Sequence, residues 1–147
     1  DIADPEVLNR GKHLFDFVRL YFNPKNPMLY RRKDIRDEIL ILFIDGRVLQ
    51  KSDSMFSDGN ASSVSTKLYS GLENLKKLDW KVINSKFWID HLDGKRKACA
   101  EALIHSRIPV NFIKKIMCNN INTQNNVIEI INNKLKIVVE VNKDYYF

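Results

Sequence analysis

Residues 14–30 read LFDFVRLYFNPKNPMLY, and this stretch decides what kind of fold the chain can adopt. Its first half, residues 15–22, is an aromatic and β-branched run that is typical of a strand. Pro24 and Pro27 end that run, because proline fixes its own φ and has no N–H to donate to a sheet. The residues that follow, 28–32, are expected to form a short helix or a loop.

The rest of the chain mixes strand and helix patterns. The strongest strand signal is residues 38–44 (EILILFI), a continuous apolar run bounded by charge that predicts a core strand. Apolar spacing predicts amphipathic helices in residues 71–80 and 122–135. Residues 98–104 (ACAEALI) are too short for their period to decide between helix and strand. Shorter strands are expected at residues 55–56 and 137–141. We therefore expect an α+β fold with a mostly antiparallel or mixed sheet.

The composition is that of an ordinary globular domain with a surplus of positive charge. The 147 residues are 44% hydrophobic and 29% charged, which is close to the average for soluble domains and sufficient for a core. We therefore expect one domain over residues 1–147. The net charge of +6 favours a polyanionic partner such as nucleic acid, although many basic domains bind nothing anionic.

The cysteines and the hydropathy argue against a secreted or membrane-spanning protein. Cys99 and Cys118 are too few for the disulfide framework of a small secreted domain, and we expect them to be reduced and buried. The sequence has no CxxC pair or Cys/His cluster, so no metal site is expected. No stretch approaches the 18 apolar residues of a membrane helix, and residues 1–5 do not form a signal peptide. These features indicate a cytoplasmic protein.

Glu101 stands out because it is an acid inside an otherwise apolar segment. A buried, unpaired carboxylate is costly, so a glutamate in such a place is usually paired or functional. The alternative is that Glu101 faces solvent from a helix or an edge strand. The residues alone leave both interpretations open.

Two further groups of side chains have both a functional and a purely structural interpretation. The aromatic residues of 20–30 can stack on a flat ring such as nicotinamide, or they can simply pack a core. Basic residues gather at 25–36 and at 95–97, where they either hold phosphates or form solvated faces. The five glycines are scattered and form no Walker loop or dinucleotide fingerprint, so a Rossmann fold is not expected.

Five parts of the sequence, in this order, resemble the DarT family of DNA ADP-ribosyltransferase toxins. They are residues 14–30, residues 56–63 (FSDGNASS), the landmarks Leu78-Asp79-Trp80 and Phe87-Trp88, residues 97–104 (KACAEALI) and the ending, residues 143–147 (KDYYF). Each is weak alone, but five in register are specific and cover nearly the whole chain. The resemblance implies an ADP-ribosyltransferase-like split β-sheet core with short peripheral helices, related to that of poly-ADP-ribose polymerases.

The resemblance also implies an activity, which is NAD-dependent ADP-ribosylation of a base in single-stranded DNA, with thymine the expected base. Glu101 matches the catalytic glutamate, which stabilises positive charge on the ribose and takes a proton from the base. Tyr21 and Tyr30 match tyrosines that pack around nicotinamide in related enzymes. Arg10 is the nearest match to an arginine that contacts NAD. The expected DNA contacts are Lys67, Lys95, Arg96 and Lys97.

Members of the family usually have a partner, a macrodomain antitoxin (DarG-like) that removes ADP-ribose from DNA. The sequence departs from the family pattern in two places. The family's opening strand carries a His-x-Thr motif that is missing here, so the chain is expected to be N-terminally incomplete. Lys67-Leu68 stands where relatives have Arg-Phe, and lysine keeps the charge but lacks arginine's planar fork.

Three functions are therefore compared. The first is the enzyme, with NAD as co-substrate and no metal. The second is a catalytically impaired, truncated relative that only binds single-stranded DNA, in a salt-sensitive way. The third is a basic structural domain without a ligand. Loss of DNA modification in Glu101→Ala separates the first from the other two.

Overall fold

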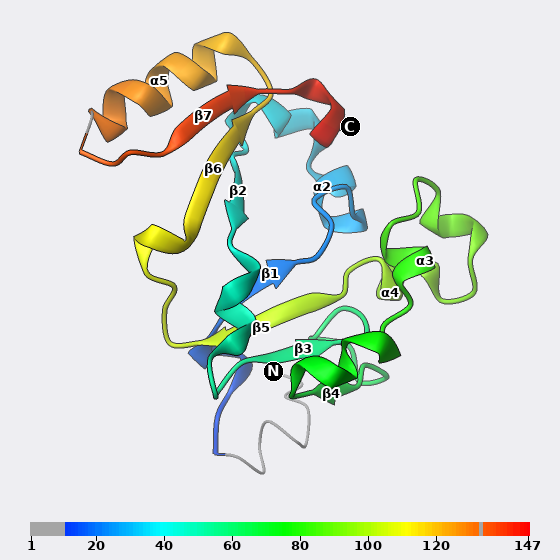
Figure 1. The fold of residues 1–147 in the computed structure, drawn as a ribbon. Helices are drawn as coiled ribbons and strands as arrows, with labels where there is room; N and C mark the ends of the chain where they lie inside the picture. Colours follow the sequence, from blue (N-terminus) through cyan, green and yellow to red (C-terminus); the bar gives the residue numbers. More distant parts are fainter. Residues whose placement is uncertain (1–10, 133) are drawn as a thin grey trace.

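The computed structural model describes residues 11–132 and 134–147, and within these ranges the chain forms two β-sheets (Figure 1). The first sheet has four strands in the order β1-β5-β3-β4, and the second has three in the order β2-β6-β7. The strands are β1 (Phe17–Tyr21), β2 (Ile41–Ile44), β3 (Met55–Ser57), β4 (Leu68–Tyr69), β5 (Glu101–His105), β6 (Ile113–Cys118) and β7 (Val138–Val141). Short helices surround the sheets, which confirms the expected α+β class.

The helices are mostly single turns. The α-helices are α2 (Pro27–Arg31), α3 (Trp80–Ile83), α4 (Gly94–Lys97) and α5 (Ile121–Ile131). The 3-10 turns are Leu14–Asp16, Lys33–Glu38, Gly46–Gln50, Leu72–Lys77, Trp88–Asp90, Val110–Phe112 and Lys143–Tyr145. The expected short helix after Pro24 is α2, whose first turn is capped by the side chain of Asn26.

Strand β5 is the centre of the first sheet. It lies between β1 and β3 and runs antiparallel to both. Apolar side chains cover both of its faces, with Phe17, Met55 and Leu103 in one cluster and Phe56, Leu78, Ile83 and Ala100 in the other. Burial on both faces explains why residues 102–104 are continuously apolar instead of alternating. In the segment 98–104, which the sequence pattern could not assign to helix or strand, the residues from Glu101 onward therefore form a strand.

The second sheet is built around β6, which pairs antiparallel with β2 and parallel with β7. A parallel pair needs a crossover connection, and α5 supplies it. The apolar face of α5 packs Val127 and Ile131 against Ile116 and Cys118 of β6. The helix ends at Asn132, which adopts the left-handed conformation that often terminates helices. The helix predicted at 122–135 is thus confirmed, with a C-terminal end earlier than expected.

Two element predictions need correction. Residues 38–44 were expected to be a core strand, but only Ile41–Ile44 are β2, an edge strand whose Leu42 side chain is 47% exposed. Residues 71–80 were expected to be one amphipathic helix, but Leu72–Lys77 form a 3-10 helix with no buried residue. The three-residue spacing of the leucines matches the 3-10 repeat of three residues per turn better than the α-helical repeat.

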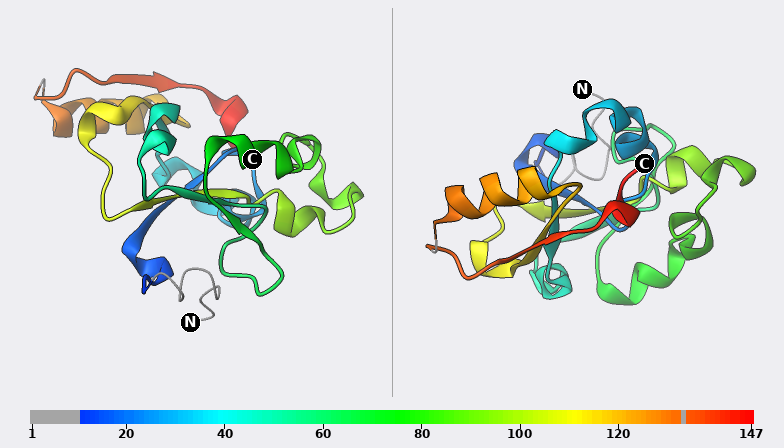
Figure 2. Two further views of the ribbon diagram at one scale, coloured as in Figure 1. Left: turned by 60° about the horizontal axis from the view of Figure 1, so that its bottom comes forward. Right: turned by 90° about the horizontal axis from the view of Figure 1, so that it is seen from above.

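The two sheets have different surroundings (Figures 1 and 2). Helix α5 and strand β7 lie together at one end of the molecule, beside β6, and α3 and α4 lie at the opposite side near the first sheet. Within the described ranges, no helix has the length and apolarity needed to cross a membrane. Cys99 and Cys118 are both buried free thiols, and burial raises the pKa of each.

Candidate active site

The strand register brings Glu101 and Tyr21 together. Glu101 is the first residue of β5 and lies directly opposite Tyr21, the last residue of β1. Residues that face each other across an antiparallel pair project to the same side of the sheet. Glu101 is only 1% exposed, so the alternative of a solvent-facing glutamate is wrong.

Arg19 holds the carboxylate of Glu101 in a two-pronged ion pair. Its Nε donates to Oε2 at 2.5 Å and its Nη2 donates to Oε1 at 2.8 Å. A bidentate pair of this kind fixes both the position and the plane of the carboxylate. We did not predict Arg19 from the sequence, yet its position gives a signal. It lies two residues before Tyr21 in a strand, and the period of two places both side chains on one face.

A loop between β3 and β4, residues 58–67, closes the other side of the site. The backbone N–H of Ala61 donates to Glu101 Oε1 at 3.1 Å. The hydroxyl of Ser62 accepts from Arg19 Nη1 at 2.9 Å, so the loop contacts both members of the ion pair. Glu101 is therefore a buried carboxylate with three N–H donors, which offsets the cost of removing its charge from water.

Tyr21 stays protonated well above neutral pH. Burial, followed by the nearby negative charge of Glu101, raises the pKa of Tyr21 to about 12. Its phenol is thus a neutral ring that keeps a proton to donate and can stack on an aromatic ligand.

A cavity of about 570 Å³ opens next to Tyr21. Both β1 and β2 line it, and each is an edge strand of its own sheet, so the cavity lies where the two sheets separate. Its wall is mainly apolar, with Arg19, Tyr21 and Arg32 adding polar groups. Glu101 is not part of this wall. The cavity reaches the neighbours of the carboxylate, Arg19 and Tyr21, and a mostly apolar cavity with a few polar groups is the usual form of a small-molecule site.

Tyr30 belongs to a different cluster. Its ring packs edge-to-face against Trp88, with centroids 6.0 Å apart, and against Phe147, with centroids 5.3 Å apart. The structure therefore brings Tyr21 to Glu101 and joins Tyr30 to the C-terminal residue of the chain. Arg10, the third predicted NAD contact, lies outside the described residues.

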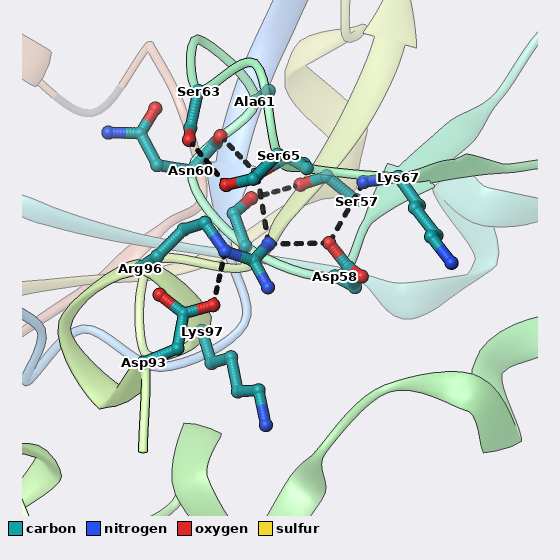
Figure 3. Close-up of polar contacts among 12 residues, drawn as sticks. Ser57, Asp58, Asn60, Ala61, Ser63, Ser65, Lys67, Asp93, Arg96 and Lys97 are labelled. Carbon is teal, nitrogen blue, oxygen red and sulfur yellow. Dashed lines mark hydrogen bonds and ion pairs between the residues drawn. The ribbon is translucent and has the colours of Figure 1, made fainter. Parts of the chain in front are cut away.

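The predicted DNA contacts have unequal surroundings (Figure 3). Lys67 and Lys95 are exposed. Lys97 pairs with Asp79 at 2.9 Å, and its ammonium group lowers the pKa of that carboxyl. Arg96 pairs with Asp58 at 2.7 Å and with Asp93 at 2.6 Å. Figure 3 shows the side chains of Lys67 and Lys97 pointing away from Arg96. Two of the four cations are therefore already paired with acids of the same chain.

In the part of the chain that the structure describes, no group of three histidine, cysteine or acidic side chains is placed to hold a metal ion.

The arrangement of a buried glutamate, a tyrosine and a cavity at a sheet split can be compared with known proteins. The model of a family described as "ssDNA thymidine ADP-ribosyltransferase, DarT" matches residues 3–147. The chain belongs to the DarT family. The resemblance seen in the sequence is thereby confirmed.

Individual DarT relatives agree with this assignment. A DNA ADP-ribosyl transferase–DNA ADP-ribosyl glycohydrolase fusion protein of Thermosipho africanus is 29% identical over 133 residues, which cover 87% of this chain and 34% of the relative. A DNA ADP-ribosyl transferase of Thermus sp. is 29% identical over 115 residues, which cover 72% of this chain and 55% of the relative. The chain thus spans about a third to a half of the length of these two DarT relatives.

The fold agrees with a solved DarT structure. The structure of Thermus sp. 2.9 DarT in complex with NAD+ superposes with a TM-score of 0.85 and 25% sequence identity. The match covers 92% of this chain and 75% of that one. The predicted ADP-ribosyltransferase-like core, split into two sheets, is therefore confirmed.

Proposed function

We propose that this DarT protein transfers ADP-ribose from NAD to thymine in single-stranded DNA, with Glu101 as the catalytic carboxylate. One observation carries the proposal. Glu101 is a buried carboxylate, fixed by three N–H donors beside Tyr21, in a chain whose family is described as single-stranded DNA thymidine ADP-ribosyltransferases. A glutamate is rarely this buried unless it is paired, and a buried charged pair next to a cavity is a candidate for a functional site.

The cavity next to Tyr21 fits a dinucleotide substrate. Its apolar wall suits the nicotinamide ring, and Tyr21 provides a neutral aromatic face for stacking. Arg19 and Arg32 in the same wall provide positive charge for phosphates. Tyr30 and Arg10 stay in the proposal as further NAD contacts, on the strength of the family resemblance alone.

Glu101 has two roles in the proposed reaction. As the bond between nicotinamide and ribose C1′ breaks, positive charge develops on the ribose, and a nearby carboxylate stabilises it. Glu101 then accepts the proton from the thymine ring nitrogen, whose lone pair forms the new bond to C1′. The nicotinamide leaves as a neutral molecule, and the proton passes from Glu101 to solvent.

Arg19 controls access to Glu101. In the structure both oxygens of the Glu101 carboxylate accept hydrogen bonds from Arg19, and Oε1 also accepts one from the Ala61 N–H. The side chain is almost completely buried. A substrate group therefore contacts Glu101 only when the guanidinium of Arg19 moves aside, toward the cavity that it also lines.

The DNA contacts that we propose are the exposed cations Lys67 and Lys95, with Lys97 after release from Asp79. Single-stranded DNA leaves the base accessible, and lysines can follow its backbone without base specificity. The expected result is DNA binding that weakens as salt is raised.

We also infer a toxin that acts in the cytoplasm and is opposed by a macrodomain antitoxin. The Thermosipho africanus relative joins its transferase to a DNA ADP-ribosyl glycohydrolase in one chain, which supports a partner of this kind. The two buried free thiols are consistent with a reducing compartment.

The test is mass spectrometry of a thymine-containing single-stranded oligonucleotide after incubation with this chain and NAD. We expect a gain of one ADP-ribose unit at thymine, and a fall in rate of roughly a thousandfold or more in Glu101→Gln. Glutamine keeps the shape of the side chain but has no negative charge and is not a base. Equal activity in the variant would sink the proposal. Salt-sensitive DNA binding without any gain of ADP-ribose would instead favour the alternative of a catalytically impaired relative that only binds single-stranded DNA.

A further inference from the structure

Arg96 lies next to a loop that contacts Glu101, and its side chain is only 13% exposed (Figure 3). Its Nε donates to Asp93 at 2.6 Å, and its Nη1 donates to Asp58 at 2.7 Å and to the hydroxyl of Thr66 at 3.0 Å. Asp58 and Thr66 lie near the two ends of the β3–β4 loop, residues 58–67. Arg96 therefore ties both ends of this loop to each other and to α4.

The backbone of the loop also closes around Arg96. The N–H of Asn60 donates to the Arg96 carbonyl at 3.0 Å, and the Thr66 hydroxyl donates to the Asn60 carbonyl at 2.7 Å. A Cβ at Gly59 would overlap Arg96 Nη1 and lie 2.9 Å from its Cγ. The guanidinium thus occupies the space that a side chain at position 59 would take.

The middle of the same loop reaches the active site. Ala61 donates its N–H to Glu101, and the hydroxyl of Ser62 accepts from Arg19. Asp58 and Thr66, which Arg96 holds, lie three and five residues from Ala61. A continuous set of contacts therefore leads from Arg96 through the loop to the carboxylate.

We propose that Arg96 is a positioning residue, which holds the β3–β4 loop so that the Ala61 N–H reaches Glu101, and is not a contact for DNA phosphate. The inference rests on the proposed function, because it assigns a role relative to the catalytic carboxylate. It reassigns one of the four cations that the sequence suggested for DNA.

Kinetics distinguish positioning from DNA binding. In Arg96→Met, the loop loses its two guanidinium bonds, at Asp58 and Thr66, while the neighbouring lysines remain. Small displacements of a catalytic group cost up to about a hundredfold, so we expect kcat to fall roughly ten- to a hundredfold. The KM for the oligonucleotide should stay within about twofold, because no binding contact is removed. A phosphate contact predicts the reverse, a raised KM and a salt dependence shallower by about one unit of slope.

Two further variants make the test specific. Arg107→Met removes the same charge from an exposed position just beyond the other end of β5, and should leave kcat unchanged. Gly59→Ala removes no charge but forces the loop and Arg96 apart, so it should reproduce the loss of kcat. Normal kcat in both Arg96→Met and Gly59→Ala would overturn the proposal.

A measurement independent of activity separates this inference from the proposed function. Amide hydrogen exchange of Ala61 reports its hydrogen bond to Glu101 in every folded variant of this chain, whether or not that variant is active. We expect exchange at Ala61 to be about tenfold faster or more in Arg96→Met, with Leu103 in the core of β5 unchanged as the check on folding. Unchanged exchange at Ala61 would contradict positioning by Arg96, even if the wild-type chain modifies DNA. Faster exchange in a chain that modifies nothing would support the positioning and reject only the enzymatic role.

Discussion

Strands β5 and β2 come from two apolar runs of equal length in the sequence, 98–104 and 38–44, and the fold uses them in opposite ways. The run at 38–44 has six apolar residues in succession, and it supplies an edge strand that borders a cavity. The run at 98–104 is interrupted by an acid, and it supplies a central strand whose first four residues are all buried. The difference lies in the neighbours. β5 has a strand on each side and a core on each face, whereas β2 has one partner strand, β6. Apolar length alone therefore does not rank strands by burial.

The largest effect that tests this difference concerns the charge buried in β5. Arg19→Met leaves the carboxylate of Glu101 without its counter-charge at a nearly inaccessible position. Breaking a buried ion pair from one side typically costs about 3–5 kcal/mol, and we expect a loss in this range because the carboxylate left behind is only 1% exposed. Urea unfolding at neutral pH measures this loss.

The control for Arg19 is the double variant Arg19→Met/Glu101→Gln, which removes both charges. We expect it to recover most of the lost stability, because a neutral amide is far cheaper to bury than an unpaired carboxylate. A double variant as unstable as the single one would mean that Arg19 acts through packing and not through charge.

The next effect compares the two strands directly. Leu103→Ala removes a fully buried side chain from the centre of β5 and should cost about 2–5 kcal/mol of unfolding free energy. Leu42→Ala changes the same chemical group in β2, where nearly half of the side chain is exposed. We expect a loss below about 1 kcal/mol there, since less apolar area returns to water. Chemical denaturation of the two variants under the same conditions measures both losses of unfolding free energy. Equal losses would contradict the assignment of β2 as a half-exposed edge strand.

Much of the fold was predictable because its local signals are strong. Residues 15–22 have strand chemistry and end at a proline turn, and both features appear as β1 and α2. The position of Glu101 within an apolar run left burial and solvent exposure both open, and the structure shows that the side chain is buried. The sequence could not show which distant side chains pair with each other. Arg19 became visible as the partner of Glu101 only through the register between β1 and β5, which joins residues 82 positions apart. The same holds for Arg96 and Asp58, which are 38 positions apart in the sequence.

The smallest effect concerns Tyr146, a buried tyrosine that packs beside the second sheet, and it can be compared with Tyr21 of the first sheet. The hydroxyl of Tyr146 lies 2.9 Å from the Ile39 carbonyl and 2.7 Å from the Met117 carbonyl, and its proton is shared between them. Burial raises the pKa of Tyr146 to about 12. The unfolded chain releases this proton near pH 10, and the folded chain keeps it until about pH 12. The contribution is therefore complete below pH 10 and is lost as the pH rises toward 12.

Tyr146→Phe removes this titration and the shared hydrogen bond together. At pH 8 the variant should be about 1 kcal/mol less stable than the wild type, the usual net value of one hydrogen bond. The gap should narrow between pH 10 and pH 12, because only the wild type loses the titrating contribution. Urea unfolding of the wild type and the variant at pH 10 and at pH 12 measures how far the stability difference narrows. Tyr21→Phe is the matched variant, and it should lose less stability at pH 8, because the phenol of Tyr21 is partly open to solvent and borders the cavity. If the stability difference between the wild type and Tyr146→Phe did not depend on pH, the phenol of Tyr146 would not be held by the carbonyls of Ile39 and Met117.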